Sequence, residues 1–423
     1  MTTLLVIIFI LGYLAIALEH PIRINKAASA LITGVLCWTV YVVSAPDSNV
    51  VNAQLLERLG DISGILFFLL GAMTIVELID AHDGFDIITQ RIRTTDKRKL
   101  MWLVSFITFF LSAVLDNLTT AIVMVSLLRK LIKDKETRLL FCGMVVIAAN
   151  SGGAWSPIGD VTTTMLWIGG QITTVSIIVH TILPSLVSVI VPILLMNMRL
   201  KGKLVPAESP VEGVKAVTNT AVQRNIVFTS GVLILLMVPV FKTVTHLPPF
   251  MGILLGLGIM WVITEFIHSE KDTSDKNMFS VQYALRKIDT SSILFFLGIL
   301  ASVAALEATG ILHGLSEKLD TAIGDERLIV SIIGVLSSIV DNVPLVAATM
   351  GMYSLEQYPT DHFFWQFLAY CAGTGGSILI IGSAAGVAAM GIEKIEFFWY
   401  LKRIAWLALA GYLAGAAVFV LSH

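Results

Sequence analysis

Two segments far apart in the chain place an aspartate and an asparagine side by side within apolar sequence. They are "SAVLDNLTTAIVMV" at 112–125 and "SSIVDNVPLVAATM" at 337–350. A carboxylate near the centre of a hydrocarbon layer costs roughly 2.5–3.5 kcal/mol even on lenient insertion scales. Carboxylate and amide oxygens are the ligands that small hard cations prefer, and a carboxylate also binds a proton. Asp116 and Asp341 are therefore candidate sites for a cation and a proton.

A third acid lies in a glycine-containing motif that also occurs twice. "NSGGAWSPIGD" at 150–160 ends on Asp160, and "GTGGSILIIGS" at 373–383 has serine in that place. These four motifs contain no Lys, Arg or His, and their net negative charge favours a cation over an anion. The candidate cation- and proton-binding residues are Asp116, Asn117, Thr119, Thr120, Asn150, Ser151, Asp160, Thr162, Thr163, Ser337, Ser338, Asp341, Asn342, Thr374 and Ser383, with Asp116, Asp160 and Asp341 as the direct metal ligands.

Each of these features also has a purely structural interpretation. Asp116, Asp160 and Asp341 each precede an apolar run and could cap a helix, but Asn or Ser would cap as well without a buried charge. The Gly-Gly pairs could serve only close helix packing. Glu77, deep in an apolar segment, is a candidate for proton access or an ordinary interfacial acid.

The composition indicates which elements must position these residues. Of the 423 residues, 56% are hydrophobic and 14% charged, against about 45–50% and 25% in soluble domains. Apolar windows recur that are long enough to cross a hydrocarbon core of about 30 Å as helices. The three cysteines show no metal spacing, and no nucleotide-binding loop or nucleophile elbow appears. We expect an all-α polytopic membrane protein in contact with lipid, which is not an enzyme and uses neither a cofactor nor nucleic acid.

Eight uninterrupted spans are expected, together with four interrupted apolar segments. The spans lie near 3–19, 28–45, 62–80, 175–198, 226–242, 250–267, 290–308 and 397–421. Segments 100–132 and 327–354 are interrupted at the two aspartate–asparagine pairs, and we interpret them as re-entrant hairpins. Segments 139–168 and 364–391 are interrupted at the Gly-Gly motifs, and we interpret them as helices broken in mid-membrane.

The interruptions belong to an internal repeat. "DISGILFFLLG" at 61–71 matches "DTSSILFFLG" at 289–298, and "SAVLDN" matches "SSIVDN". Residues 1–198 then form a first repeat, 199–225 a cytoplasmic linker and 226–423 a second repeat. Each repeat has five spans, one of them broken, plus a hairpin. An odd number of crossings inverts the second repeat relative to the first, as in many secondary transporters.

The distribution of basic residues tests this topology. All of the 28 Lys and Arg residues except Arg58, Lys242, Lys318 and Arg327 fall on one side of the traced chain. By the positive-inside rule that side is cytoplasmic, so both termini face outward. If each hairpin instead crosses as two true spans, the charge pattern is the same. That alternative needs two short spans of about 14 residues from 100–132, below the usual 17 or more.

"LDNLTTAIVM", "NSGGAWSPIGDVTTTM", "VDNVPLVAA" and "GTGGSILIIGSAAG" together resemble the NhaD-type sodium/proton antiporters of the ion transporter superfamily. The resemblance covers nearly the whole chain. It implies export of Na⁺ or Li⁺ in exchange for H⁺, a role in pH homeostasis, a homodimer, and a bacterial inner (plasma) membrane location. By matching positions it implies roles for Asp116, Asn117, Thr119, Thr120, Asn150, Ser151, Asp160, Thr162, Thr163, Ser337, Asp341 and Asn342, with Na⁺ as the metal.

Three alternatives stay open at this point. Dicarboxylate/sodium symporters of the same superfamily look similar, but carry Ser-Asn-Thr at the hairpin tips, where this chain has a carboxylate. Arsenite efflux proteins are another related class, with a neutral substrate. A passive cation channel belongs to a different class, because carboxylates in mid-membrane also line pores.

Overall fold

The computed structural model describes residues 2–89, 92, 94–200, 202–204, 220–269 and 278–423. Over these residues the regular structure is helical, and an isolated bridge between Asp96 and Lys203 is the one β feature. Eight of the described helices are long and apolar enough to cross a membrane. The predicted all-α, polytopic membrane fold is therefore confirmed.

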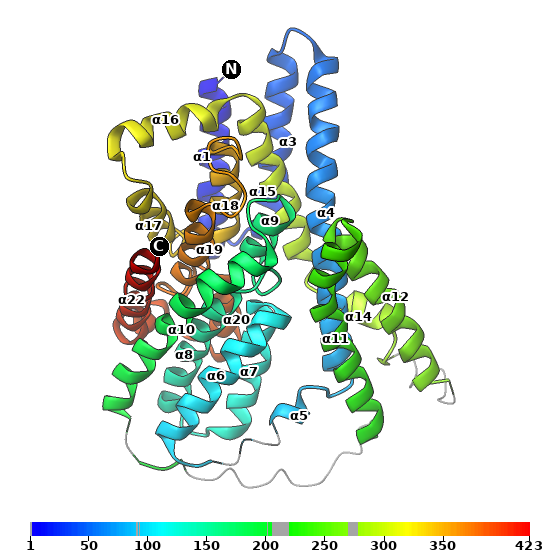
Figure 1. The fold of residues 1–423 in the computed structure, drawn as a ribbon, viewed down its shortest axis with the longest axis vertical. Coiled ribbons are helices and arrows are strands. Elements are labelled where there is room, and N and C mark those ends of the chain that lie inside the picture. Colours follow the sequence, from blue (N-terminus) through cyan, green and yellow to red (C-terminus); the bar gives the residue numbers. More distant parts are fainter. Residues whose placement is uncertain (1, 90–91, 93, 201, 205–219, 270–277) are drawn as a thin grey trace.

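Ten helices precede the predicted linker (Figure 1). They are α1 (Thr2–Ala17), α2 (Glu19–Ile22), α3 (Lys26–Ser44), α4 (Ser48–Ala81), α5 (Asp86–Thr89), α6 (Lys97–Leu115), α7 (Asn117–Leu131), α8 (Lys135–Gly153), α9 (Val161–Ile168) and α10 (Thr174–Arg199). Helix α4 begins well before the expected start at 62. Asp47 caps it, and its first turns are too polar for a hydropathy pattern to detect.

The remaining described helices follow the linker. They are α11 (Ala221–Thr245), α12 (Pro249–Ile267), α14 (Val281–Lys287), α15 (Thr290–Ala308), α16 (Ile311–Ile323), α17 (Glu326–Leu336), α18 (Asn342–Met352), α19 (Phe363–Gly375), α20 (Ala384–Glu393), α21 (Phe397–Tyr400), a π-helical turn (Leu401–Ala405) and α22 (Trp406–Ser422). The predicted linker 199–225 is too long at its end, because Thr220 forms a capping box with Gln223 and starts α11. Residues 205–219 of that linker lie outside the described residues.

The four predicted interruptions are real breaks in helices. Asp116 alone separates α6 from α7, and residues 337–341 separate α17 from α18. Residues 154–160 and 376–383 divide α8 from α9 and α19 from α20. The start of α6 and the end of α7 lie at the same end of the molecule, whereas α17 and α18 lie toward the opposite end (Figure 1).

The first half of the predicted hairpin is longer than the sequence suggested. Helix α6 has 19 residues, against the expected 14 or so, because Asp96 caps it ahead of the apolar run. Helix α6 is by itself long and apolar enough to cross a membrane, so the expected length was wrong for α6. Helix α7 has 15 residues, close to the expected length and below the usual 17 or more.

Glycines allow the broken helices to approach the hairpins closely. A Cβ on Gly152 of α8 would collide with the carbonyl oxygen of Phe109 in α6. A Cβ on Gly375 of α19 would collide in the same way with the carbonyl oxygen of Gly334 in α17. Close packing thus accounts for one glycine of each Gly-Gly pair.

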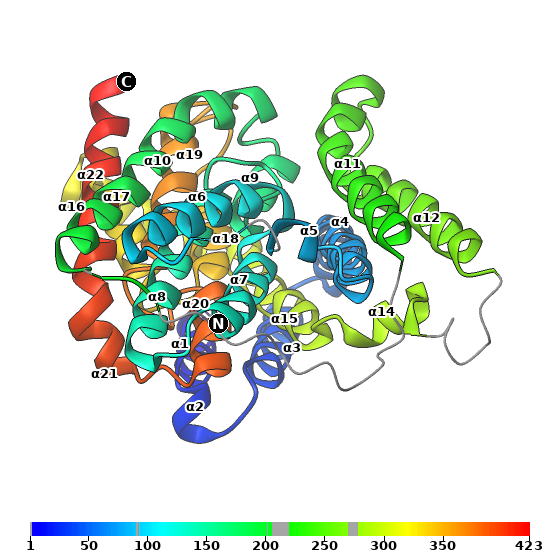
Figure 2. The same cartoon turned by 90° about the horizontal axis from the view of Figure 1, so that it is seen from below.

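The helices form two groups when seen from below. Helices α11 and α12 stand with α4 to one side of the cluster that contains α6–α10 and α17–α22 (Figure 2). Helix α3 packs against α15, where Gly34 and Gly298 let the two backbones approach. The breaks of the cluster face α4 and α15, and a cavity lies between them.

Candidate cation-binding site

The cavity has a volume of about 60 Å³, several times the roughly 10–15 Å³ that one water needs. Its polar lining consists of Lys26, Asp116, Asn117, Asp160, Thr164, Ser292, Asp341 and Asn342, and its apolar lining includes Phe68, Leu69, Met73 and Phe296. Most of the polar residues come from the breaks between α6 and α7, between α8 and α9, and between α17 and α18, and we call this group the polar wall. The apolar residues come from α4, α6, α11, α12 and α15 among others, so the cavity combines charged groups with an apolar lining.

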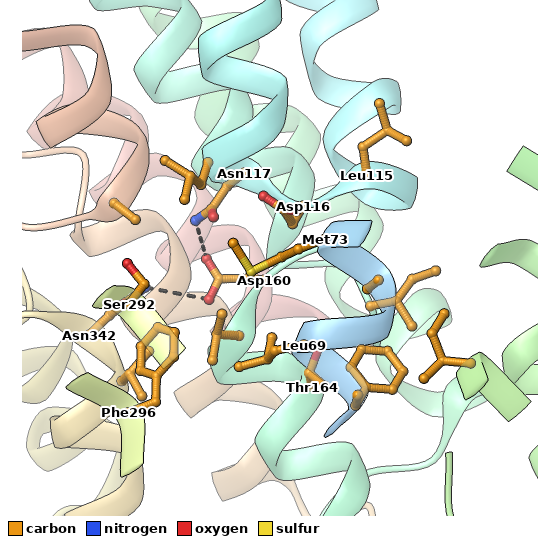
Figure 3. A pocket seen from close by; sticks show the side chains of 18 of the residues that line it. Leu69, Met73, Leu115, Asp116, Asn117, Asp160, Thr164, Ser292, Phe296 and Asn342 are labelled. Carbon is orange, nitrogen blue, oxygen red and sulfur yellow. Dashed lines mark hydrogen bonds between the residues drawn. The ribbon is translucent and has the colours of Figure 1, made fainter. Parts of the chain in front are cut away.

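Asp160 is the centre of the polar wall. Its side chain is almost fully buried, with the residue 2% exposed. The amide of Asn117 donates to Oδ2, and the amide of Asn342 donates to Oδ1 at 3.5 Å. Figure 3 shows Asp160 between these two asparagines. Thr162 also donates to Oδ1, through its backbone N–H at 2.8 Å and its hydroxyl at 2.7 Å.

A second set of hydrogen bonds joins this network to the other broken helix. Asn117 donates to Oδ1 of Asn150 at 3.1 Å, and Asn150 donates to Oγ of Ser383 at 2.8 Å. Ser383 is the N-cap of α20 and accepts from the N–H of Gly386. The network therefore links α7, α8 and α20, which come from both predicted repeats.

Asp116 occupies a strained turn between α6 and α7. Its φ of 84° and ψ of 159° lie in a region that is almost exclusive to glycine and costs of order 1–3 kcal/mol. The carboxylate caps α7, accepting from the N–H of Thr119 at 2.8 Å and from its hydroxyl at 2.9 Å. The backbone is thus held in an unfavourable conformation that brings the carboxylate to the cavity.

Asp341 has a different partner. It caps α18, accepting weakly from the N–H of Val343 at 3.4 Å. Its Oδ2 lies 3.1 Å from Nζ of Lys26, the first residue of α3. The two side chains are 17% and 24% exposed respectively, so the ion pair is only partly desolvated. The two aspartates that the sequence treats as twins therefore differ in their environment.

The other candidate residues lie behind the cavity lining. Thr120 is buried, as is Ser151, which accepts from Ser188, and Thr163 bonds the Asp160 carbonyl. Ser337, Ser338 and Thr374 donate to backbone carbonyls of their own helical turns. Glu77 lies on α4, outside the lining residues. Five of the candidates line the cavity, namely Asp116, Asn117, Asp160, Asp341 and Asn342.

Helix capping is real at all three aspartates, but it does not explain their charge. Asp116, Asp160 and Asp341 cap α7, α9 and α18. Ser383 caps α20 at the position that corresponds to Asp160 in the repeat. A hydroxyl therefore performs the capping role where no charge is present, which leaves the carboxylates free to have another role.

Lys26, Thr164 and Ser292 are lining residues that the sequence reasoning missed. Lys26 was counted among the cytoplasmic basic residues, and nothing in its neighbourhood signals a partner in the second half. Ser292 had a signal, because it belongs to the repeated segment 289–298. Phe68 and Phe296 are at matching positions of that repeat, and both line the cavity. Repetition was thus the informative feature.

The three aspartates line one cavity without forming a compact metal cluster. Among the described residues, no group of three or more His, Cys, Asp or Glu side chains lies close enough together to hold a metal ion. The three-aspartate sodium site stays a prediction.

Broken helices that meet at a charged cavity inside a multi-pass helical protein define a membrane transporter. A sequence model of the citrate transporter family, CitMHS, matches residues 6–373. The chain belongs to this family and, within it, to the NhaD-type sodium/proton antiporters. This confirms the resemblance and the expectation that the protein is not an enzyme.

Two relatives come from Arabidopsis thaliana and one from Vibrio cholerae. Sodium/proton antiporter 1 is 51% identical over 99% of this chain and 72% of its own length. Sodium/proton antiporter 2 is 48% identical over 99% of both chains. The Na⁺/H⁺ antiporter NhaD of Vibrio cholerae is 30% identical over 98% of this chain and 90% of its own length.

Proposed function

We propose that this protein is a secondary active antiporter that exchanges Na⁺ for H⁺ across a membrane. The observation that carries the proposal is the cavity at the helix breaks, with three carboxylates and two amides in its lining. Relatives that match nearly the full chain are named sodium/proton antiporters. The site and the relatives thus support the same pair of ions.

The exchange follows from competition for the same oxygen atoms. A carboxylate that binds a proton loses its charge and with it most of its affinity for a cation, and a bound cation in turn disfavours protonation. The gradient of one ion can then drive the other ion in the opposite direction through the same site. Li⁺ is a smaller and harder cation than Na⁺ with the same preference for oxygen ligands, and we propose that it is also transported.

Carboxylate transport is the second candidate, because the family is described as citrate transporters. Helix N-termini are natural anion sites, and α7, α9 and α18 all begin at the cavity. Their N–H groups are already taken by this chain's own aspartates, through Thr119, Thr162 and Val343. Citrate would meet three carboxylates at that wall, so the geometry favours a cation.

Proton flux in proteoliposomes tests the proposal. We expect an imposed Na⁺ gradient to move protons in the opposite direction, and citrate to have no effect. Asp116→Asn and Asp341→Asn should each abolish the exchange yet fold, since Asn caps helices as well as Asp does. Ser105→Ala, a buried change on α6 away from the lining, is the control. If both Asn variants exchanged at the wild-type rate, the ion site would be elsewhere.

The same assay separates the antiporter from the passive cation channel. A channel would dissipate the Na⁺ gradient without moving protons. Arsenite efflux would leave proton flux independent of Na⁺. Replacing Na⁺ by Li⁺ or K⁺ in the same vesicles measures cation selectivity.

We also propose that the two halves are inverted repeats with both termini on the outer face. Corresponding contacts in the two halves support the repeat itself. Ser112 of α6 donates to the carbonyl of Ala149 at 2.6 Å, and Ser337 donates to that of Ala372 at 3.2 Å. Both serines precede their aspartate–asparagine pair by four residues, and both bind the adjacent broken helix.

Labelling of introduced cysteines tests the first hairpin. Arg98 and Asp134 are exposed at the start of α6 and just after α7. Arg98→Cys and Asp134→Cys should both react with an impermeant reagent from the cytoplasmic side. The native Cys37, Cys142 and Cys371 are buried and should give little background. Reaction from opposite sides would show that α6 and α7 together cross the membrane once, and would exclude the hairpin.

The protein is a multi-pass integral membrane protein, as the eight apolar helices and the family require. The bacterial inner membrane stays a prediction, because the relatives include proteins of Arabidopsis thaliana as well as of bacteria. The homodimer likewise stays a prediction, which the mass of the purified protein in detergent would test.

A further inference from the structure

The ion pair between Lys26 and Asp341 joins residues from the two predicted repeats. Nζ of Lys26 lies 3.1 Å from Oδ2 of Asp341 and 4.4 Å from the ring centre of Phe295 on α15. The carboxylate and the aromatic face both attract a cation. The ammonium group is therefore held at the cavity by two independent contacts.

Lys26 is the one basic side chain that lines the cavity among the residues that the structure describes. The other two lining carboxylates have neutral partners. Asp116 binds the backbone and hydroxyl of Thr119, and Asp160 binds amides and Thr162. Asp341 thus differs from both in having a cation of the protein's own within contact distance.

The location of Lys26 is unfavourable for a residue that serves stability alone. It is the first residue of α3, where the positive end of the helix dipole repels an ammonium group. Asp341, by contrast, lies at the start of α18, where the dipole stabilises an anion. The two helix dipoles thus favour the anion and disfavour the cation, so the lysine is kept beside the carboxylate at a cost.

We propose that Lys26 is a tethered cation that competes with the transported cation for Asp341 and so determines the affinity for that cation. The proposal rests on the function proposed above. A cation that binds Oδ2 must displace Nζ, because two positive charges cannot share that oxygen without strong repulsion. The four-carbon side chain of lysine is flexible enough to withdraw.

The competition also explains which group pairs with Asp341 when no transported cation is bound. When the cation leaves, Lys26 returns to Asp341, so that the carboxylate is not left unpaired at a partly desolvated site. No change in the protonation of Lys26 is required. Lys26 therefore determines the affinity of the site, and the carboxylate for which it competes with the transported cation is Asp341.

Replacing Lys26 by Met tests the proposal in the full-length protein. Methionine removes the charge and keeps a long, flexible side chain that can pack on Phe295. We expect Lys26→Met to lower the apparent KM for Na⁺ about tenfold, which corresponds to about 1.4 kcal/mol. Lys26→Arg keeps a cation beside Asp341 and should stay within about threefold of the wild type.

Equilibrium binding of radioactive Na⁺ to the purified protein gives a second measurement that does not depend on turnover. The dissociation constant should fall by the same factor in Lys26→Met. If this variant does not fold, Lys26→Gln removes the charge while keeping a donor for Asp341, and the same tightening is expected.

An unchanged or weaker affinity in a folded, neutral variant would overturn the proposal and leave Lys26 as a structural contact. Failure of the proposed function gives a different result. In that case the wild type would show no proton movement driven by Na⁺, whereas the binding comparison between wild type and Lys26→Met would still be readable.

Discussion

Asn117 and Asn342 both direct their amides to the carboxylate of Asp160. Each asparagine follows the aspartate of its own motif, and the two motifs lie 225 residues apart, whereas Asp160 has only a serine counterpart. One buried carboxylate in the first half therefore binds the starts of both α7 and α18.

This arrangement predicts the effect of Asp160→Asn. The new amide would keep an oxygen for Thr162 but present a second NH₂ group to Asn117 or Asn342, so that two donors face each other in a buried site. An unsatisfied buried polar group costs about 1–3 kcal/mol. We expect at least a hundredfold loss of Na⁺-driven proton flux, together with a lower unfolding temperature.

Thr108→Val provides the matched control for that variant. Thr108 is buried on α6 and bonds only the carbonyl of Val104 in its own helix. Its removal should leave exchange intact. If Asp160→Asn exchanged ions at the wild-type rate, the carboxylate would have only a structural role and none in transport.

The close approach of α8 to α6 predicts the effect of Gly152→Ala. The added Cβ meets backbone atoms of Phe109, which cannot rotate away as a side chain would. Overpacking of this kind typically costs about 1–3 kcal/mol. We expect a lower unfolding temperature and reduced exchange, because the break that carries Asp160 must shift.

Gly258→Ala on α12 tests the helix propensity separately. A Cβ there has no atom within 4 Å, and Ala is favoured over Gly in a helix by up to about 1 kcal/mol. This variant should be as stable as the wild type or slightly more so. Equal behaviour of the two alanine variants would contradict the packing argument.

Glu393 contacts one largely buried and one exposed arginine. We expect these two contacts to contribute very differently to the free energy of unfolding. The side chain of Glu393 is 2% exposed at the end of α20 and lies 2.8 Å from Nε of Arg138 and 3.1 Å from Nε of Arg129. Glu393→Ala leaves the largely buried Arg138 without its carboxylate, and breaking a buried pair costs about 3–5 kcal/mol. Thermal unfolding of the purified protein should show a clear decrease.

Arg129→Ala removes the exposed partner from the same cluster. Its side chain is 58% exposed, and exposed ion pairs contribute about 0–1 kcal/mol. The unfolding temperature should change little. A decrease as large as that of Glu393→Ala would show that the burial of the two contacts does not determine their strength.

Asp96 lies outside the membrane-spanning segments, and we expect it to make a pH-dependent contribution to the free energy of unfolding. The backbone N–H of Lys99, followed by that of Arg98, donates to its carboxylate and lowers its pKa below the ordinary value. A lowered folded-state pKa stabilises the protein above the unfolded value of about 3.9. That contribution is lost as the pH falls through the folded-state pKa.

Asp96→Asn isolates the charge, because Asn caps a helix as well as Asp does. The wild type should unfold at a higher temperature than this variant at pH 6, and the difference should shrink as the pH falls below the unfolded-state pKa of about 3.9. Thr220→Ala removes a cap that does not titrate, and its effect should not depend on pH. A constant difference for Asp96→Asn would exclude a role of the charge.

Much of the fold follows from local signals in the sequence. The breaks at Asp116 and Asp160 could be predicted because a polar residue, glycine or proline interrupts an apolar run there. Such an interruption depends only on residues that are neighbours along the chain. Where local signals were misleading, as in α4 and α6, a capping aspartate extended the helix into polar sequence that hydropathy does not register.

The repeat in the sequence also led to the prediction that the acids at the breaks share one cavity. It could not distinguish hydroxyls that line the cavity from those that bond their own helical turn, such as Ser338 and Thr374. That distinction depends on side-chain direction, which spacing does not determine.

The sequence by itself determined that carboxylates lie at breaks within apolar helices, which is why a membrane cation transporter could be inferred from it. Only the tertiary structure decided that Asp160 receives the amides of Asn117 and Asn342 and that Lys26 is the partner of Asp341. Those partners are up to 315 residues apart. Contacts of that kind depend on how helices pack, and no local pattern encodes them.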